Sequence, residues 1–93
     1  EDFAVVRAEG SEWMLHADHT YSDHVLSETL QKAPSRGIGA ELRIHGCDPD
    51  IAEAAAHQRG DFVLVSAKNK PHGLREVYII DPDGYLWVPS IAL

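Results

Sequence analysis

The sequence predicts an α+β fold in which a helix covers one face of a β-sheet. Residues 40–45 alternate apolar and polar side chains, a pattern typical of a strand that is covered on one face. A helix is predicted next, from Asp48 to the residue before Gly60. Three segments rich in β-branched and aromatic residues follow it, and each predicts a strand: residues 62–66, 74–80 and 85–91.

The N-terminal part predicts a β-hairpin followed by a connection. Residues 3–7 and 12–16 are short β-rich runs, and the turn signal Glu9-Gly10-Ser11 separates them. Residues 21–39 are hydrophilic and contain Pro34 and two glycines, so we expect mainly a linker. A short turn of helix capped by Ser22 is the alternative for this segment.

Signals for the start and the end of a helix surround residues 49–59. Asp48 can accept a hydrogen bond from an early backbone N–H, and Pro49 suits the first helical position. The negative charge of Asp50 complements the positive end of the helix dipole, and Gly60 can adopt the left-handed conformation that ends a helix. The residues predicted to form its narrow apolar stripe are Ile51, Ala54 and Ala55.

Two connections and one proline shape the last three predicted strands. A loop is expected over residues 68–73, and the segment Asp81-Pro82-Asp83-Gly84 predicts a tight turn. Pro89 has no N–H to donate to a neighbouring strand, so the last strand is predicted to lie at an edge of the sheet or to fray there.

Composition limits the classes of function. The chain has 93 residues, with 8 Lys and Arg against 15 Asp and Glu, giving a formal charge of −7. This length suits a single domain, and the negative charge argues against nucleic acid as a partner. No apolar run reaches the length that a membrane-spanning helix needs, so no membrane association is expected. Cys47 is the only cysteine and allows no internal disulfide, which favours the cytoplasm.

The segment from Gly73 to Trp87, with the sequence GLREVYIIDPDGYLW, resembles the closing module of a known family once the preceding strand and helix are included. It is similar to the glyoxalase/bleomycin resistance protein/dioxygenase superfamily, also called vicinal oxygen chelate. The resemblance implies βαβββ modules whose sheets curve into a cup. Residues 40–93 correspond to one complete module and residues 1–20 to the last strands of another, with residues 21–39 as the linker. A single glyoxalase-like domain is therefore expected, without the opening strand and helix of its first module.

The resemblance also implies where a divalent metal would be held. In the family each module supplies one ligand from its first strand and one from its last. The last-strand position corresponds to Val88 here, and the matching position of the preceding module falls near Met14; the first strand offers Glu41. Valine has no lone pair, and a thioether is a poor ligand for hard or borderline divalent metals. We therefore predict no metal site and no other cofactor.

The same resemblance assigns side chains to the cup. On residues 40–46, Leu42 and Ile44 suit the core, so alternation places Glu41, Arg43 and His45 in the cup, the side to which Val88 is assigned. For the strand over residues 74–80, Val77 and Ile79 suit the core, although the reverse assignment stays open. The predicted ligand-binding residues are His16, Glu41, Arg43, His45, Glu76 and Tyr78.

Two of these residues allow more than one interpretation. Arg43 could clamp a ligand carboxylate through its planar guanidinium, or it could only pair with Glu41 or Glu76. His45 could serve as a general base or be an ordinary polar residue of the sheet. A concave surface of mixed polarity suits a small organic molecule.

Three functions remain open at this level. The first is a metal-free protein that binds a small organic molecule, as in the bleomycin-resistance branch. The second is a metal-dependent lyase, isomerase or dioxygenase that uses Glu41, His45 and Glu76. The third is an interaction role, in which unpaired sheet edges associate with another chain. A homodimer is expected, with exchange of modules between chains as one arrangement.

Overall fold

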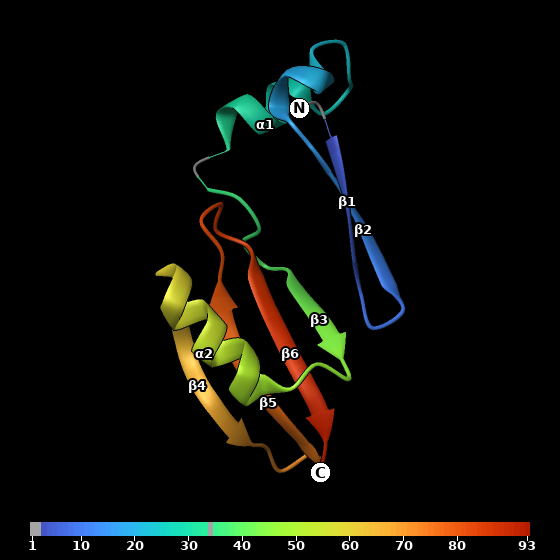
Figure 1. Ribbon diagram of the computed structural model, residues 1–93. Helices are drawn as coiled ribbons and strands as arrows, with labels where there is room; N and C mark the ends of the chain where they lie inside the picture. Colours follow the sequence, from blue (N-terminus) through green and yellow to red (C-terminus); the bar gives the residue numbers. More distant parts are fainter. Residues whose placement is uncertain (1–2, 34) are drawn as a thin grey trace. The chain divides into compact units, whose positions relative to one another are not determined.

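The computed structural model describes residues 3–33 and 35–93, and the chain divides into two compact units (Figure 1). The first, here called the hairpin unit, is Glu1–Ser35, and the second, the sheet unit, is Arg36–Leu93. No helix in the described ranges has both the length and the apolar character needed to cross a membrane.

The hairpin unit begins with two antiparallel strands, β1 (Phe3–Ala8) and β2 (Ser11–His16). Their turn places Glu9 at φ 49° and Gly10 at φ 80°. Two consecutive residues with positive φ are what a two-residue turn needs to match the twist of the flanking strands. The predicted hairpin is confirmed, with each strand one residue longer than expected.

The segment expected to be mainly a linker contains a short helix, the α-helix α1 (Ser27–Lys32). A 3-10 helix, η1 (Asp18–Tyr21), ends at the first residue of this segment. Leu26, and not Ser22, occupies the N-cap position of α1. Side chains one helical turn apart support this short helix: Lys32 pairs with Glu28, and Gln31 donates to Ser27. Local pairs of this kind favour a helix even where the apolar pattern is weak.

The sheet unit has the strand–helix–strand–strand–strand order that the sequence predicts. Its sheet is ordered β3-β6-β5-β4, with β3 and β6 parallel and the other neighbours antiparallel. In this unit, the α-helix α2 lies on one face of the sheet (Figure 1). The elements are β3 (Glu41–His45), α2 (Pro49–Arg59), β4 (Phe62–Asn69), β5 (Leu74–Ile80) and β6 (Leu86–Ala92). Strand β4 therefore continues three residues beyond its predicted end and shortens the following loop.

The predicted ends of α2 are confirmed. The Asp48 side chain accepts hydrogen bonds from the backbone N–H groups of Asp50 at 2.9 Å and Ile51 at 3.4 Å. Gly60 ends the helix at φ 80°, in the left-handed region. The cap satisfies two N–H groups that have no partner within the helix.

The predicted apolar stripe of α2 is wrong. Ile51 is 70% exposed and Ala54 is exposed, whereas Ala56 is fully buried. Ala56 forms the core with Val77 and Ile79 of β5. Residues packed around this core are Ala52, Val63 and Ala67. The helix therefore faces the sheet through small side chains that the pattern of large apolar residues did not single out.

Polar contacts fix this rotation of α2. Arg75 of β5 donates to both carboxylate oxygens of Asp50 at 2.8 Å. Glu53 accepts a hydrogen bond from the backbone N–H of Ala67 at 2.7 Å. Because these residues hold one side of the helix against β4 and β5, Ile51 is turned towards solvent.

The position predicted for Pro89 is also wrong, because β6 lies between β3 and β5 rather than at an edge. The backbone N–H of Leu93 donates to the carbonyl of Gly73, just before β5. Alternate residues of a strand direct their backbone nitrogen to the same neighbour, so the nitrogen of Pro89 faces β5. The register between β5 and β6 leaves out Val88 and Pro89, while Trp87 and Ser90 on either side of them are paired. One missing hydrogen bond is thus tolerated where the neighbouring pairs close the ladder and the ring is buried.

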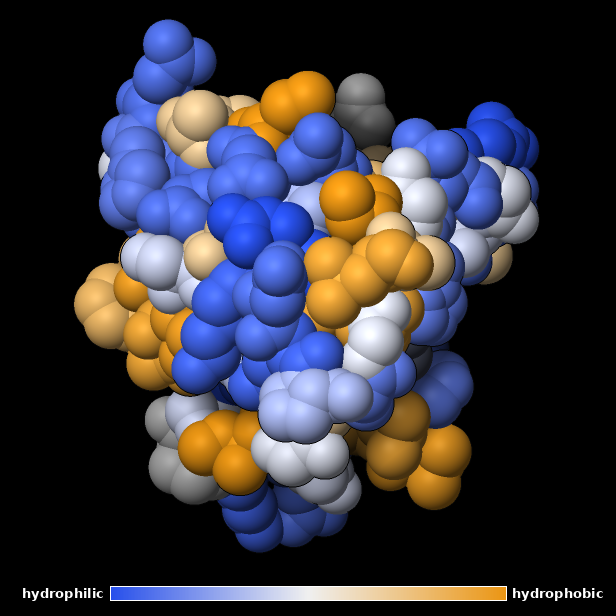
Figure 2. Space-filling view, turned by 90° about the horizontal axis from the view of Figure 1, so that it is seen from below, coloured by the Kyte–Doolittle hydropathy of each residue, from blue (hydrophilic) through white to orange (hydrophobic). Residues whose placement is uncertain are grey.

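Several large apolar side chains remain exposed in each unit. Figure 2 shows such side chains in separate places among hydrophilic ones. Those of the sheet unit that are at least 60% exposed are Ile38, Ile51, Phe62 and Leu93.

Candidate functional site

A polar cluster occupies the face of the four-stranded sheet opposite α2, here called the helix-free face. The register pairs Arg43 with Val88 across β3 and β6, and Glu76 with Ser90 across β5 and β6. Side chains of directly paired residues share a face, so these strands bring distant parts of the sequence together. Val77 and Ile79 lie in the core under α2, which settles the open assignment for β5. The residues of the helix-free face used below are Glu41, Arg43, His45, Glu76, Tyr78, Val88 and Ser90.

Arg43 joins two carboxylates of this face. Its Nη1 donates to Glu76 Oε2 at 2.9 Å, and its Nη2 donates to Glu41 Oε2 at 3.3 Å. The hydrogen bond and charge of Glu76, with a smaller contribution from Glu41, raise the pKa of Arg43 further above its ordinary value. Arg43 therefore pairs with both acidic residues that the sequence offered as partners.

Glu76 is the buried member of the cluster, with 1% of its surface exposed. Burial by itself would raise the pKa of Glu76, but the hydrogen bond and charge of Arg43 and the nearby His72 outweigh it and lower the pKa. His72 Nε2 lies 3.5 Å from Oε2. Oε1 is buried and has no hydrogen-bond partner among the described residues. The carboxylate is thus held ionised while one of its oxygens keeps unused acceptor capacity.

Tyr78 presents an aromatic surface beside these charges. Burial and the neighbouring carboxylates of Glu41 and Glu76 raise the pKa of its phenol. The phenol therefore stays protonated at neutral pH and can donate or accept a hydrogen bond. The Nζ of Lys70 lies 5.6 Å from the centre of its ring, within the range of a cation–π interaction.

At the end of β3, His45 Nδ1 lies 3.2 Å from the hydroxyl oxygen of Ser90. Ser90 is fully buried, and its backbone carbonyl accepts from the N–H groups of Gly46 and Cys47. Sequence reasoning missed Ser90, although it follows Val88 by two residues and so belongs to the same face of the strand. Sequence reasoning placed Lys70 and His72 only within the loop expected over residues 68–73.

His16, the remaining predicted ligand-binding residue, belongs to the hairpin unit. Its ring stacks on Phe3 and meets the edge of Tyr21, each with 5.7 Å between ring centres. Met14 is on the same face of the hairpin and is 57% exposed. The ligand-binding role of His16 stays a prediction.

The helix-free face does not suit the divalent metal that the resemblance implies. Val88 offers no donor atom, and its neighbour in register is a guanidinium, whose positive charge repels a metal cation. The two carboxylates nearby, Glu41 and Glu76, are already paired with Arg43. Among residues 3–33 and 35–93, no three His, Cys, Asp or Glu side chains are grouped as a metal ion requires.

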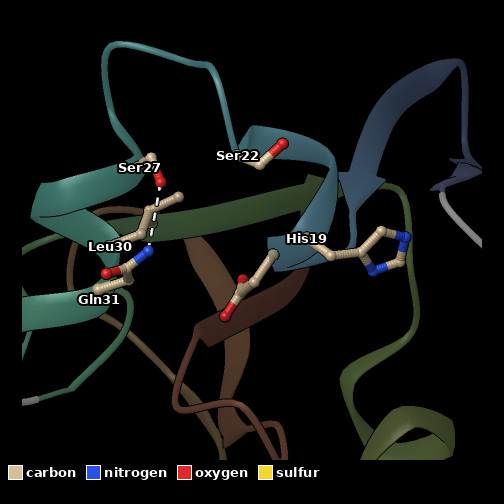
Figure 3. A pocket seen from close by; sticks show the side chains of 6 residues that line it. His19, Ser22, Ser27, Leu30 and Gln31 are labelled. Carbon is tan, nitrogen blue, oxygen red and sulfur yellow. Dashed lines mark hydrogen bonds between the residues drawn. The ribbon is translucent and has the colours of Figure 1, made fainter.

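The hairpin unit contains a separate pocket of about 180 Å³ (Figure 3). At its rim Gln31 donates to the hydroxyl of Ser27 at 3.4 Å. The lining residues are Asp18, His19, Ser22, Ser27, Leu30 and Gln31. None of them is buried, so they do not form the desolvated polar site that specific recognition needs.

Comparison with solved structures tests the fold. A glyoxalase/bleomycin resistance protein/dioxygenase from Nocardioides matches 99% of the chain, with a TM-score of 0.70 and 20% identity. A family enzyme of the same description from Burkholderia phytofirmans PsJN matches 98% of the chain, with a TM-score of 0.75 and 16% identity. The chain has the glyoxalase/bleomycin resistance protein/dioxygenase fold. The resemblance seen in the Gly73–Trp87 segment is thereby confirmed for the fold.

The chain is shorter than the proteins whose structures it matches. It spans 62% of the Nocardioides protein and 66% of a superfamily member from Sphaerobacter thermophilus DSM 20745, to which it is 22% identical with a TM-score of 0.65. No protein-family model matches the sequence, and no curated protein is significantly similar to it. One complete βαβββ module and a hairpin are what this chain contributes to the fold.

Proposed function

We propose that this chain binds a small organic molecule on the helix-free face and does so without a metal. The observation that carries the proposal is the pairing of Arg43 with Val88 at the centre of that face. Val88, an aliphatic side chain, occupies a position where, by the resemblance, metal-dependent relatives place a chelating group, and the guanidinium of Arg43 lies beside it. The remaining polar atoms around them can orient a ligand by hydrogen bonds.

The chemistry of the face supports recognition of a small molecule. Tyr78 offers an aromatic surface, Arg43 has donors beyond the two it uses, and Glu76 has an unused acceptor. Charged groups that hold one another in place lose little conformational freedom when a ligand arrives. A rigid set of donors and acceptors next to an aromatic ring is typical of a binding site.

The test combines elemental analysis with a melting-temperature screen. The protein is purified without chelators, its content of Ni, Zn, Fe and Mn is measured, and small aromatic compounds of different charge are screened for stabilisation. We expect substoichiometric metal and a raised melting temperature with at least one compound class. Stoichiometric metal, lost together with ligand binding on dialysis against EDTA, would instead favour the metal-dependent lyase, isomerase or dioxygenase.

A homodimer and a cytoplasmic location complete the proposal. Strands β3 and β4 lie at the two edges of the four-stranded sheet, and exposed sheet edges favour pairing with another chain. Sedimentation velocity over a range of protein concentrations tests the dimer, and a monomer at all of them would contradict it. Nucleic acid is not expected to bind, because the charge is −7.

A further inference from the structure

We propose that the helix-free face recognises the protonated amino group of a small aromatic amine, held between Glu76 and the ring of Tyr78. This inference rests on the proposed function and specifies the chemical class of its ligand. It starts from the unpartnered Oε1 atom of Glu76, on a side chain that is 1% exposed.

An ionised carboxylate oxygen without a donor is costly inside a protein. Arg43 and His72 both approach Oε2, and Oε1 has no hydrogen-bond partner among the described residues. A ligand N–H that reaches Oε1 would supply the missing hydrogen bond. Hydrogen bonds between two charged groups are the strongest of this kind, so a protonated amine fits better than an amide or a hydroxyl.

The neighbouring Tyr78 ring already attracts an ammonium group, since Lys70 Nζ lies 5.6 Å from its centre. Lys70 therefore shows where a positive charge is favourable in this cluster. The backbone of Lys70 is fixed, because its N–H donates to Leu74 and its carbonyl accepts from Gly73. The flexible side chain of Lys70 would move for a ligand cation to take its place.

The local charge balance also favours a cation. Once Lys70 has moved away, the carboxylates of Glu41 and Glu76 outnumber the guanidinium of Arg43 by one charge, a difference that His72 beside Glu76 cancels only when its ring is protonated. Lys68 lies opposite Glu76 on the edge strand β4, but it is exposed and its charge is screened by solvent. An anionic ligand would meet two carboxylates that Arg43 already balances only in part.

The test is an NMR titration of the 93-residue chain, which follows the backbone amides of Tyr78 and Arg43. Four matched probes are compared: benzylammonium, benzyltrimethylammonium, benzyl alcohol and benzoate. We expect benzylammonium to bind about tenfold more tightly than the alcohol and the carboxylate. The affinity of benzyltrimethylammonium should lie between that of benzylammonium and those of the alcohol and the carboxylate, because it keeps the charge but has no N–H for Glu76.

Substitutions separate the two contributions. Glu76→Gln should weaken benzylammonium binding about tenfold and leave benzyl alcohol unchanged. Lys70→Met should tighten benzylammonium about threefold, because it removes the competing cation from the Tyr78 ring. Lys32→Met removes the same charge from α1 in the hairpin unit and should change nothing.

Each result decides one level of the proposal. Binding of benzyl alcohol or benzoate at these residues, as tightly as benzylammonium, would overturn the amine inference and leave the proposed function standing. Weaker or unchanged binding in Lys70→Met would also overturn it, independently of whether Glu76→Gln folds. Absence of binding on this face by every probe and every compound of the melting screen would overturn both proposals.

Discussion

The guanidinium of Arg43 donates to the buried carboxylate of Glu76 at 2.9 Å, across residues 33 positions apart in the sequence. The parallel pairing of β3 with β6 and the antiparallel pairing of β6 with β5 bring the two residues to one face. Glu76 is 1% exposed, so this pair has consequences for stability as well as for binding.

Replacing Arg43 with methionine should destabilise the protein. The substitution keeps much of the side-chain length but leaves Glu76 as a buried charge without its main partner. We expect a loss of about 2–3 kcal/mol in the free energy of unfolding, less than for a fully buried pair because Arg43 is partly exposed. Urea denaturation followed by circular dichroism measures it. Arg43→Met combined with Glu76→Gln should recover most of the loss, and a double variant as unstable as the single one would contradict this account.

The lowered pKa of Glu76 predicts a loss of stability in acid. In the unfolded chain this carboxyl takes up its proton near its ordinary value of 4.5, whereas in the folded protein it does so only at lower pH. Its contribution is therefore complete above about pH 4.5 and is lost as the pH falls through the folded value. Urea denaturation at a series of pH values should show a shallower acid decline for Glu76→Gln than for the unchanged protein. Equal declines would mean that Glu76 does not contribute.

Gly37 should not tolerate a side chain. A Cβ atom at this position would lie 2.6 Å from Cδ1 of Tyr85, and φ is +73°. Gly39 is a matched control, because its φ is +84° and nothing lies within 4 Å of such a Cβ. Gly39→Ala should cost about 1 kcal/mol from backbone strain alone, and Gly37→Ala should cost distinctly more. Thermal unfolding of both variants gives the comparison, and equal losses would show that the contact with Tyr85 is unimportant.

Asp48→Ala should weaken α2 at its start. The side chain of Asp48 satisfies the N–H groups of Asp50 and Ile51, and its removal leaves both without this acceptor. We expect a loss of about 1 kcal/mol in the free energy of unfolding. Asp48→Asn, which keeps an acceptor oxygen, should lose much less. If the two substitutions cost the same, the hydrogen bonds of the cap are not what stabilises this end of the helix.

Short-range chemistry made much of the fold predictable. Alternation along residues 40–45 indicated the two faces of β3, and Asp48 and Gly60 marked the ends of α2. For β5 alternation left both assignments open, and only the core contacts of Val77 and Ile79 decided between them. Pro89 was misplaced because the position of a strand within a sheet depends on long-range pairing. A local pattern shows only that one N–H is missing.

The rotation of α2 and the composition of the site depended on tertiary contacts. Ile51 is the largest apolar residue of the helix, yet the bonds between Arg75 and Asp50 turn it outward. Five of the six predicted ligand-binding residues lie on one face of the sheet, because alternation along a strand is a strong signal for which side chains share a face. Lys70 joined the cluster only through a turn whose conformation the sequence did not specify.

Binding in the presence and absence of EDTA tests the central claim most directly. Benzylammonium, or the best compound of the melting screen, is titrated into the labelled protein with and without the chelator, and the amides of Arg43 and Tyr78 are followed by NMR. The account predicts the same affinity and the same perturbed residues in both conditions. Binding that disappears with EDTA and returns with a divalent metal would contradict it.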